Sequence, residues 1–178
     1  MKLLRTIRLD PSDTFVFERA AAPGEWAVSG GFVFFDADPD RLTGKARAAF
    51  RGGFLGIDSL GWSTLVQVVE ARAEERAAVV EMLAQRLLAQ FGAPDLAAAT
   101  AAAEEEVAFA ASLTDHPLDT LIAVHRARED GAIRETFRTL RPRQGEKPLR
   151  AFAFMEVEGE EDPGDTVDLL GLAQDHRR

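Results

Sequence analysis

The residues of this chain best suited to binding an anion lie in one stretch, SLTDHPLDTLIAVHRAREDGAIRETFRTLRP, from Ser112 to Pro142. It contains two of the three histidines and five of the arginines. Arginine presents a planar fork of donors that matches the two oxygens of a carboxylate or phosphate, and an imidazole adds a further donor. Whether these groups come together depends on how the stretch folds.

The stretch is predicted to form a β-hairpin. Asp130 and Gly131 separate two runs of strand-forming residues, and Asp-Gly in that position favours a two-residue turn. With these residues at the turn, His125 lies opposite Thr136, and opposed residues share a face of the sheet. That side, which we call the cationic face, carries His125, Arg134, Thr136 and Arg138.

The other side of the hairpin is more apolar and is predicted to cover the core. It carries Ile122, Val124, Ile133, Phe137 and an Arg126–Glu135 pair. Two interpretations of the cationic face remain open. It is either a site for an anionic ligand or the solvated side that antiparallel sheets ordinarily show. A register slip of one residue would scatter its members between the two sides.

Other candidate sites are weaker. The segment TDHPLD offers Asp115, His116 and Asp119, which with His125 supply mixed oxygen and nitrogen ligands. Their spacing matches no known metal motif, and a helix that ends before Pro117 explains the segment as well. The three glutamates of residues 104–106 are interpreted as an exposed helix face. We therefore predict no metal site and no cofactor.

Motifs of catalysis are also missing from the sequence. The glycine-rich RGGFLGIDSLGW, from Arg51 to Trp62, lacks the Gly-Lys-Ser/Thr ending of a phosphate loop, and there is no Gly-x-Ser-x-Gly. The chain has no cysteine, which excludes disulfides and thiolate chemistry. No catalytic residue is predicted. Trp62 remains a candidate to line a ligand pocket near the cationic face, because pockets favour aromatic side chains.

Charge narrows the class of partner. With 21 basic and 30 acidic residues the formal net charge is −9, and an acidic chain is repelled by phosphate backbones. We expect no nucleic-acid partner. The N-terminal MKLLRTIRLD is not a signal peptide, and no long apolar run predicts a membrane span. The expected location is the cytoplasm, with a protein partner or a homo-oligomer.

The elements that position these residues are predicted as follows. Strands are expected at Leu3–Leu9, at Thr14–Glu18, at Glu25–Asp36 as a central strand, and at Trp62–Ala71. A helical hairpin follows, with a left-handed cap at Gly92 between its helices. The hairpin of the cationic face and a last strand at Arg150–Glu158 complete the sheet.

We therefore expect one α+β domain with a largely antiparallel sheet of about six or seven strands and a helical hairpin packed on one face. Its parts are N-terminal strands at 1–71, the helical hairpin at 73–113, C-terminal strands at 120–158, and a tail at 159–178 that packs back onto the body.

Two long segments carry a resemblance. LTDHPLDTLIAVHRARE…GAIRETFRTLRP near the C-terminus and KLLRTIRLDPSDTFVFERAA…EWAVSGGFVF at the N-terminus resemble a family of uncharacterised bacterial proteins of unknown function. The resemblance covers most of the chain and implies no known activity or catalytic residue. The expected function is that of a non-enzymatic accessory or binding protein. The alternative is a small-molecule binding protein or enzyme that uses His125, Arg134 and Arg138 on an anionic ligand, with Trp62 nearby.

Overall fold

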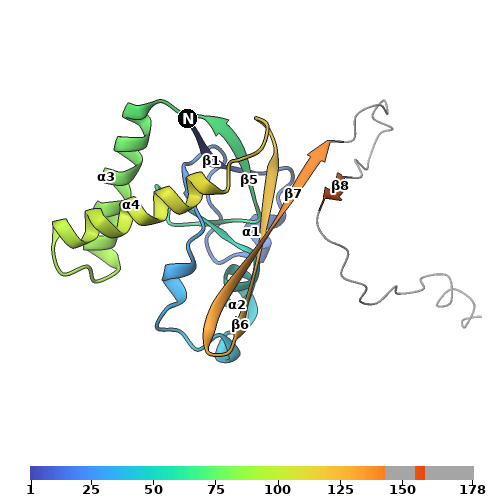
Figure 1. Ribbon diagram of the computed structural model, residues 1–178. Coiled ribbons are helices and arrows are strands. Elements are labelled where there is room, and N and C mark those ends of the chain that lie inside the picture. Colours follow the sequence, from blue (N-terminus) through green and yellow to red (C-terminus); the bar gives the residue numbers. More distant parts are fainter. Residues whose placement is uncertain (143–154, 159–178) are drawn as a thin grey trace, which may run out of the picture.

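The computed structural model describes residues 1–142 and 155–158. Its larger sheet is antiparallel throughout, with five strands in the order β1-β5-β6-β7-β8. In Figure 1 the long β6–β7 hairpin runs past α2 to a turn at the lower edge of the view. The strands are β1 (Lys2–Ile7), β5 (Leu65–Glu70), β6 (Leu121–Glu129), β7 (Ala132–Pro142) and β8 (Met155–Glu158).

A smaller antiparallel sheet in the order β2-β3-β4 lies against the edge of the larger one. An isolated bridge between Arg5 and Trp26 joins it to β1. Its strands are β2 (Ala27–Val28), β3 (Phe54–Gly56) and β4 (Trp62–Ser63). Short helical elements connect these strands: α1 (Ser12–Val16), the 3-10 helices η1 (Gly31–Phe34) and η2 (Pro39–Arg41), and α2 (Gly44–Gly52).

Two long helices, α3 (Ala73–Gln90) and α4 (Leu96–Ser112), form the predicted helical hairpin and cover one face of the sheet (Figure 1). Gly92 between them has a φ of 76°, as expected for a left-handed cap, and the Asp95 side chain caps α4 by accepting from the amide of Ala98. The apolar sides of both helices join the main core, including Leu83 of α3 and Val107 of α4.

The α+β class, the antiparallel pairing and the packed helical pair are therefore confirmed, with the strands divided between two sheets. Within the described ranges, no helix combines the length and the apolar character needed to cross a bilayer. The last predicted strand is present as Met155–Glu158. Its first residues, 150–154, and the packing of the tail at 159–178 lie outside the described residues.

The strand predicted at Thr14–Glu18 is wrong, and Asp13 explains why. The segment folds as helix α1, and the buried Asp13 carboxylate accepts hydrogen bonds from the hydroxyl (2.5 Å) and the amide (3.2 Å) of Thr64. The same contact divides the strand predicted at Trp62–Ala71. Because the amide of Thr64 is directed to Asp13, the residues before it pair with β3 and those after it with β1 and β6.

The central strand predicted at Glu25–Asp36 is also wrong beyond its first residues. Only Ala27–Val28 pair as a strand, and Gly30 then adopts a left-handed φ of 79° and begins η1. A side chain at Gly30 has no room, because its Cβ would lie 2.7 Å from the Cβ of Leu55. Apolar residues at both odd and even positions do not distinguish a buried strand from a turn of helix, and here Phe34 is buried while Phe35 is 72% exposed.

Candidate functional site

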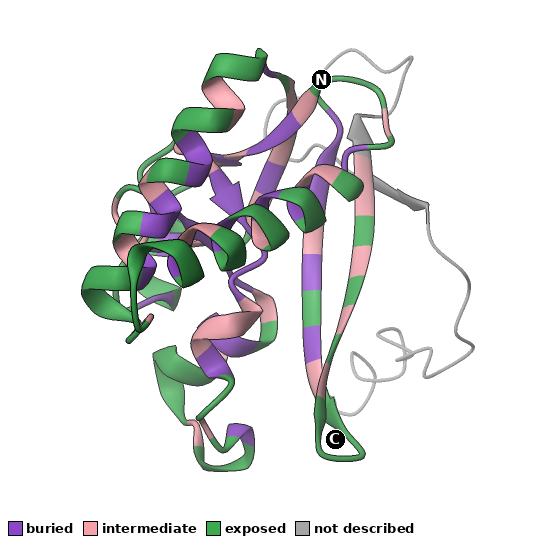
Figure 2. Cartoon of the chain, turned by 60° about the vertical axis from the view of Figure 1, so that its left-hand side comes forward, coloured by how far each residue is buried: buried purple, intermediate pink, exposed green. Residues whose placement is uncertain are grey.

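The β6–β7 hairpin has the register that the sequence predicts. Asp130 and Gly131 form the turn with positive φ angles of 51° and 81°. His125 pairs with Thr136, and Ala127 and Ala123 pair with Arg134 and Arg138. Figure 2 shows this alternation as purple and green bands in the middle of β6. The structure therefore brings His125, Arg134, Thr136 and Arg138 onto one side.

All four residues of the cationic face are exposed. Arg134, Thr136 and Arg138 alternate along β7, so the two arginines are separated by about 13 Å at the usual rise of a strand. Their cross-strand neighbours on β6 are two small residues, Ala127 and Ala123. Arg134 contacts Glu129 at 3.0 Å, and both side chains are about 60% exposed (62% and 59%). Such a pair contributes at most about 1 kcal/mol and exchanges readily with another carboxylate.

The cationic face continues into partly apolar surface. Ala123 pairs with Leu65 of β5, which pairs with Ile7 of β1, and all three side chains are only half-buried. The row from Arg138 to Ile7 thus crosses four strands on the side of the sheet opposite the buried Val66 and Ile122. An exposed surface that combines arginine with apolar side chains resembles a protein interface in composition.

Trp62 does not join the cationic face. It lies on β4, stacks on Phe34 with a centroid distance of 5.3 Å, and packs on the same small cluster as Ile133, which is on the core side of the hairpin. His116 lies at the opposite end of β6, where its carbonyl accepts from the Lys2 ammonium at 2.6 Å. Among residues 1–142 and 155–158, no three histidine or carboxylate side chains gather in a way that could hold a metal ion.

The core side of the hairpin holds a polar network around Arg126. This arginine is 1% exposed, and its Nε donates to Glu135 at 2.5 Å. Its remaining nitrogens donate to the C-terminal end of α2 and to Ser29, the residue after β2. The acceptors are the carbonyls of Ala49, Phe50, Gly53 and Ser29 and the Ser29 hydroxyl. The carbonyl end of a helix attracts a cation, so the placement is electrostatically favourable.

Glu135 completes this network. Its side chain is 17% exposed and also accepts from the Ser29 hydroxyl. Burial lowers the pKa of Arg126, while the charge and hydrogen bond of Glu135 raise it. An arginine keeps its proton in proteins, so the pair is ionised. The sequence predicted the Arg126–Glu135 pair on the core side, but nothing in it indicated the four backbone carbonyls that surround the guanidinium.

Glu106 of α4 was missed by sequence reasoning, which assigned it to an exposed face. It is half-buried where α4 crosses the hairpin, and burial together with the charge of Glu135 raises its pKa to about 7, although Arg126 opposes the shift. One signal was available. Glu106 lies four residues before the buried Ala110 and three before Phe109, which is 40% exposed and whose ring meets that of Phe137 at 5.8 Å.

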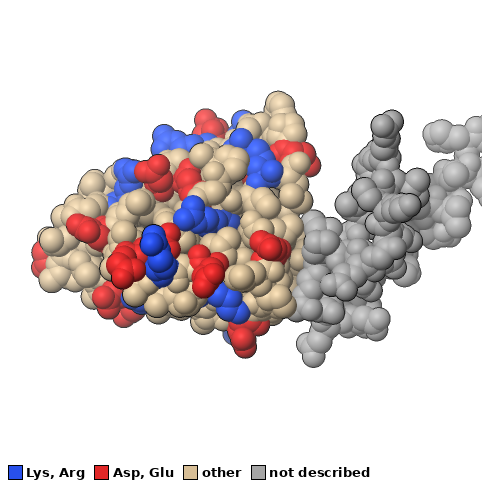
Figure 3. All heavy atoms as spheres, turned by 90° about the horizontal axis from the view of Figure 1, so that it is seen from above, with Lys and Arg blue, Asp and Glu red and all other residues tan. Residues whose placement is uncertain are grey.

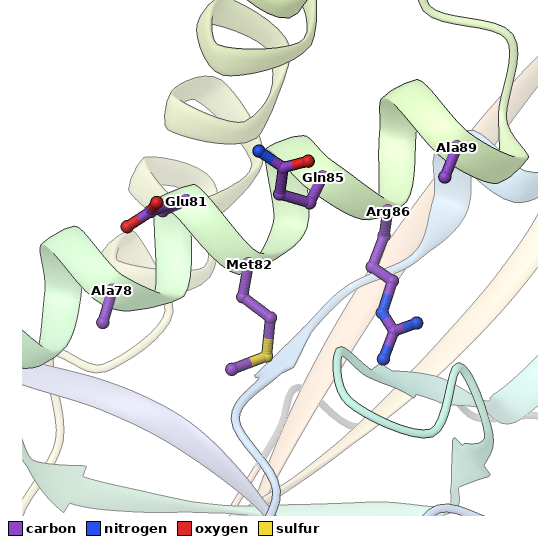
Figure 4. A pocket seen from close by; sticks show the side chains of 6 residues that line it. All are labelled: Ala78, Glu81, Met82, Gln85, Arg86 and Ala89. Atoms are coloured by element: carbon purple, nitrogen blue, oxygen red, sulfur yellow. The ribbon is translucent and has the colours of Figure 1, made fainter.

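Within the described residues, two surface grooves are lined by residues of the helical hairpin. One, of about 480 Å³, runs along α3 and is lined by Ala78, Glu81, Met82, Gln85, Arg86 and Ala89. Figure 4 shows Arg86 reaching from the helix, where it donates to the carbonyl of Asp58 at 2.5 Å. The other, of about 300 Å³, lies between α3 and α4 and includes Val80 and Thr100. Neither groove includes a member of the cationic face.

Comparison with known proteins gives one match. No curated protein and no solved structure matches the chain. The model of a family of unknown function, DUF6505, matches residues 1–159, which include both sheets, the helical hairpin and the whole of the β6–β7 hairpin. The chain therefore belongs to this family of unknown function.

Proposed function

We propose that this protein is a non-enzymatic accessory or binding protein of the bacterial cytoplasm, and that it holds an acidic segment of a protein partner on the cationic face. The observation that carries the proposal is the register of the hairpin, which gathers His125, Arg134 and Arg138 on one exposed side of a rigid sheet. The bacterial assignment is supported by the family resemblance of the two long segments.

The charge of the whole chain supports a local, oriented contact. At a net charge of −9 the protein repels an acidic partner at long range, so approach is favoured only where basic groups gather. On the face drawn in Figure 3, basic and acidic side chains are interspersed and form no large area of one sign. The cationic face has a different distribution of charge. Its two arginines lie on β7 and its histidine on the neighbouring β6, and the carboxylate of Glu129 contacts Arg134.

The shape of the surface favours a peptide over a small molecule. The members of the cationic face are exposed on a sheet, and the arginine spacing of about 13 Å suits carboxylates several residues apart on an extended segment. A small anionic ligand is the second candidate, favoured by the donor forks of Arg134 and Arg138. A small ligand bound there would be more exposed than in an ordinary small-molecule site, which encloses most of the ligand surface in a pocket.

Replacing both arginines tests the proposal. The probe is a fluorescein-labelled peptide of alternating glutamate and serine, and its affinity is measured by fluorescence anisotropy at low and high salt. We expect the Arg134→Ala, Arg138→Ala double variant to bind about tenfold more weakly, because two exposed ion pairs are lost. The melting temperature should barely change, since both side chains are exposed.

The matched control is the Lys45→Ala, Arg47→Ala double variant, which removes the same charge from exposed positions on α2. If it weakens the peptide as much as the hairpin variant does, the effect is only one of net charge and the proposal fails. Inorganic phosphate and citrate form the second arm. The native chain could bind either anion tightly, lose that binding in Arg134→Ala, and not bind the peptide. That result would show that the cationic face binds a small anionic ligand and would contradict the proposed protein partner.

A further inference from the structure

The outer edge of β7 carries backbone groups that the β6–β7 hairpin does not use. The residues that flank a two-residue turn bond one another through the backbone, and bonded pairs then alternate with non-bonded pairs along the strands. Because Glu129 and Ala132 flank the turn, Ile133, Glu135 and Phe137 direct their N–H and C=O groups away from β6. Among residues 1–142 and 155–158, these groups have no backbone partner on that side.

The same edge accepts an antiparallel strand nearer the end of β7. Strand β8 pairs with Thr139–Pro142 and lies beside that end alone (Figure 1). Within the part of the chain that the structure describes, residues 132–138 of β7 therefore form the margin of the larger sheet. Unpaired strand edges bind extended peptides through main-chain hydrogen bonds, and side-chain contacts then select the sequence.

A strand added to this edge would place its side chains on two chemically different sides. On the cationic face, Arg134 and Arg138 lie four residues apart on β7, so carboxylates four residues apart on the added strand would lie opposite both. The other side offers the half-buried Ile133 and Phe137, and beside Phe137 the exposed ring of Phe109. That side favours apolar residues at the intervening positions.

We propose that the acidic partner segment binds as an added antiparallel strand along residues 132–138 of β7, and that acidic and apolar residues alternate in it. This inference rests on the proposed function and states how the partner binds and what pattern its sequence has. The backbone groups of Ile133, Glu135 and Phe137 bond the added strand, while Arg134 and Arg138 select its carboxylates.

Charge argues against a second copy of this chain as the occupant of the edge. Two antiparallel β7 strands centred on Glu135 place this carboxylate opposite its own copy, and centring on Thr136 places Arg134 opposite Arg138. Like charges directly opposite one another destabilise a sheet. An acidic segment brings the charge that complements the two arginines.

N-methylation of a peptide backbone tests the strand addition on the native chain. The probe is a short fluorescein-labelled peptide of alternating glutamate and valine, with one derivative methylated on the valine amides and a matched one on the glutamate amides. In the proposed strand the valines lie opposite Ile133, Glu135 and Phe137 and bond β7, whereas the glutamate amides point away. Methylated valines should weaken binding at least about tenfold in fluorescence anisotropy, and methylated glutamates less than about twofold.

The outcomes separate this inference from the proposed function. If the unmodified peptide needs Arg134 and Arg138 but both methylated derivatives bind as well as it does, the strand addition is overturned and the proposed function is retained. If the Arg134→Ala, Arg138→Ala double variant binds the unmodified peptide as tightly as the native chain, both proposals fail. Weaker binding of the glutamate-methylated derivative alone would overturn the antiparallel arrangement.

The chain offers one alternative occupant of its own, because Glu160, Glu161 and Asp162 follow β8 in the sequence. The test is repeated with these three residues replaced by serine. Equal affinity in this variant and in the native chain supports an external partner. Binding that appears only in the variant would assign the edge to the acidic segment of this chain and overturn the inference.

Discussion

Replacing Arg126 with leucine is expected to lower the free energy of unfolding by about 3–5 kcal/mol, as is typical when one partner of a buried ion pair is removed. The change leaves the 17% exposed Glu135 without its cation and removes the donor that the carbonyls of Phe50, Gly53 and Ser29 share. Arg126→Lys should recover only part of this stability, because an ammonium lacks the planar fork that reaches α2 and β2 together.

Urea unfolding monitored by circular dichroism measures the effect, and Arg128→Leu is the matched control. Arg128 lies two residues further along β6 and pairs with Asp38 at 3.2 Å, but its side chain is 40% exposed. Loss of such a surface pair should cost at most about 1 kcal/mol. Equal destabilisation by the two substitutions would show that the buried network around Arg126 adds nothing to the stability of the fold.

Substitution of Gly61 by alanine is expected to have the second large effect, a loss of about 3 kcal/mol or more. An added Cβ would lie 2.6 Å from the backbone of Ala20 and Ala21, where an isolated bridge joins Ala20 to Trp62. Backbone atoms cannot yield as a flexible side chain does, so the segment leading to β2 must move. Thermal and urea unfolding both report the loss.

Gly52→Ala provides the comparison for Gly61. Its added Cβ would meet only the Val124 carbonyl, at an ordinary contact distance of 3.8 Å, and the residue has no positive φ. Since Gly52 lies in the last turn of α2, where alanine is the better helix former, the substitution should be neutral or slightly stabilising. A Gly61→Ala variant as stable as Gly52→Ala would mean that the Ala20–Trp62 bridge is not required.

The C-terminal half of the described fold is predictable because its signals are local. Asp130-Gly131 specifies the turn, the turn specifies the register, and the register places His125 opposite Thr136 and Arg126 opposite Glu135. The helical hairpin is equally clear, because a period of 3.6 residues and the Gly92 cap are both visible in the sequence. The outward position of the cationic face follows from these features alone.

The N-terminal half depends on contacts between distant residues. The amide of Thr64 leaves the sheet because of Asp13, which lies 51 residues earlier, and no pattern around either residue indicates this. The half-burial of Glu106 depends on tertiary packing of α4, which brings Phe109 onto Phe137. Trp62 is separated from the cationic face because it belongs to the second sheet. The alternating apolar residues of Trp62–Ala71 predict one continuous strand and do not indicate this division.

The acceptors of Arg126 also bear on the order in which the chain folds. They lie 73 to 97 residues away along the sequence, at the C-terminal end of α2 and at Ser29, just after β2. The β6–β7 hairpin can close early around its two-residue turn, whereas the guanidinium meets these carbonyls only after a long loop has closed, at an entropic cost. Docking of α2 and β2 should therefore be a late kinetic step, and Arg126→Leu should accelerate unfolding far more than it slows folding.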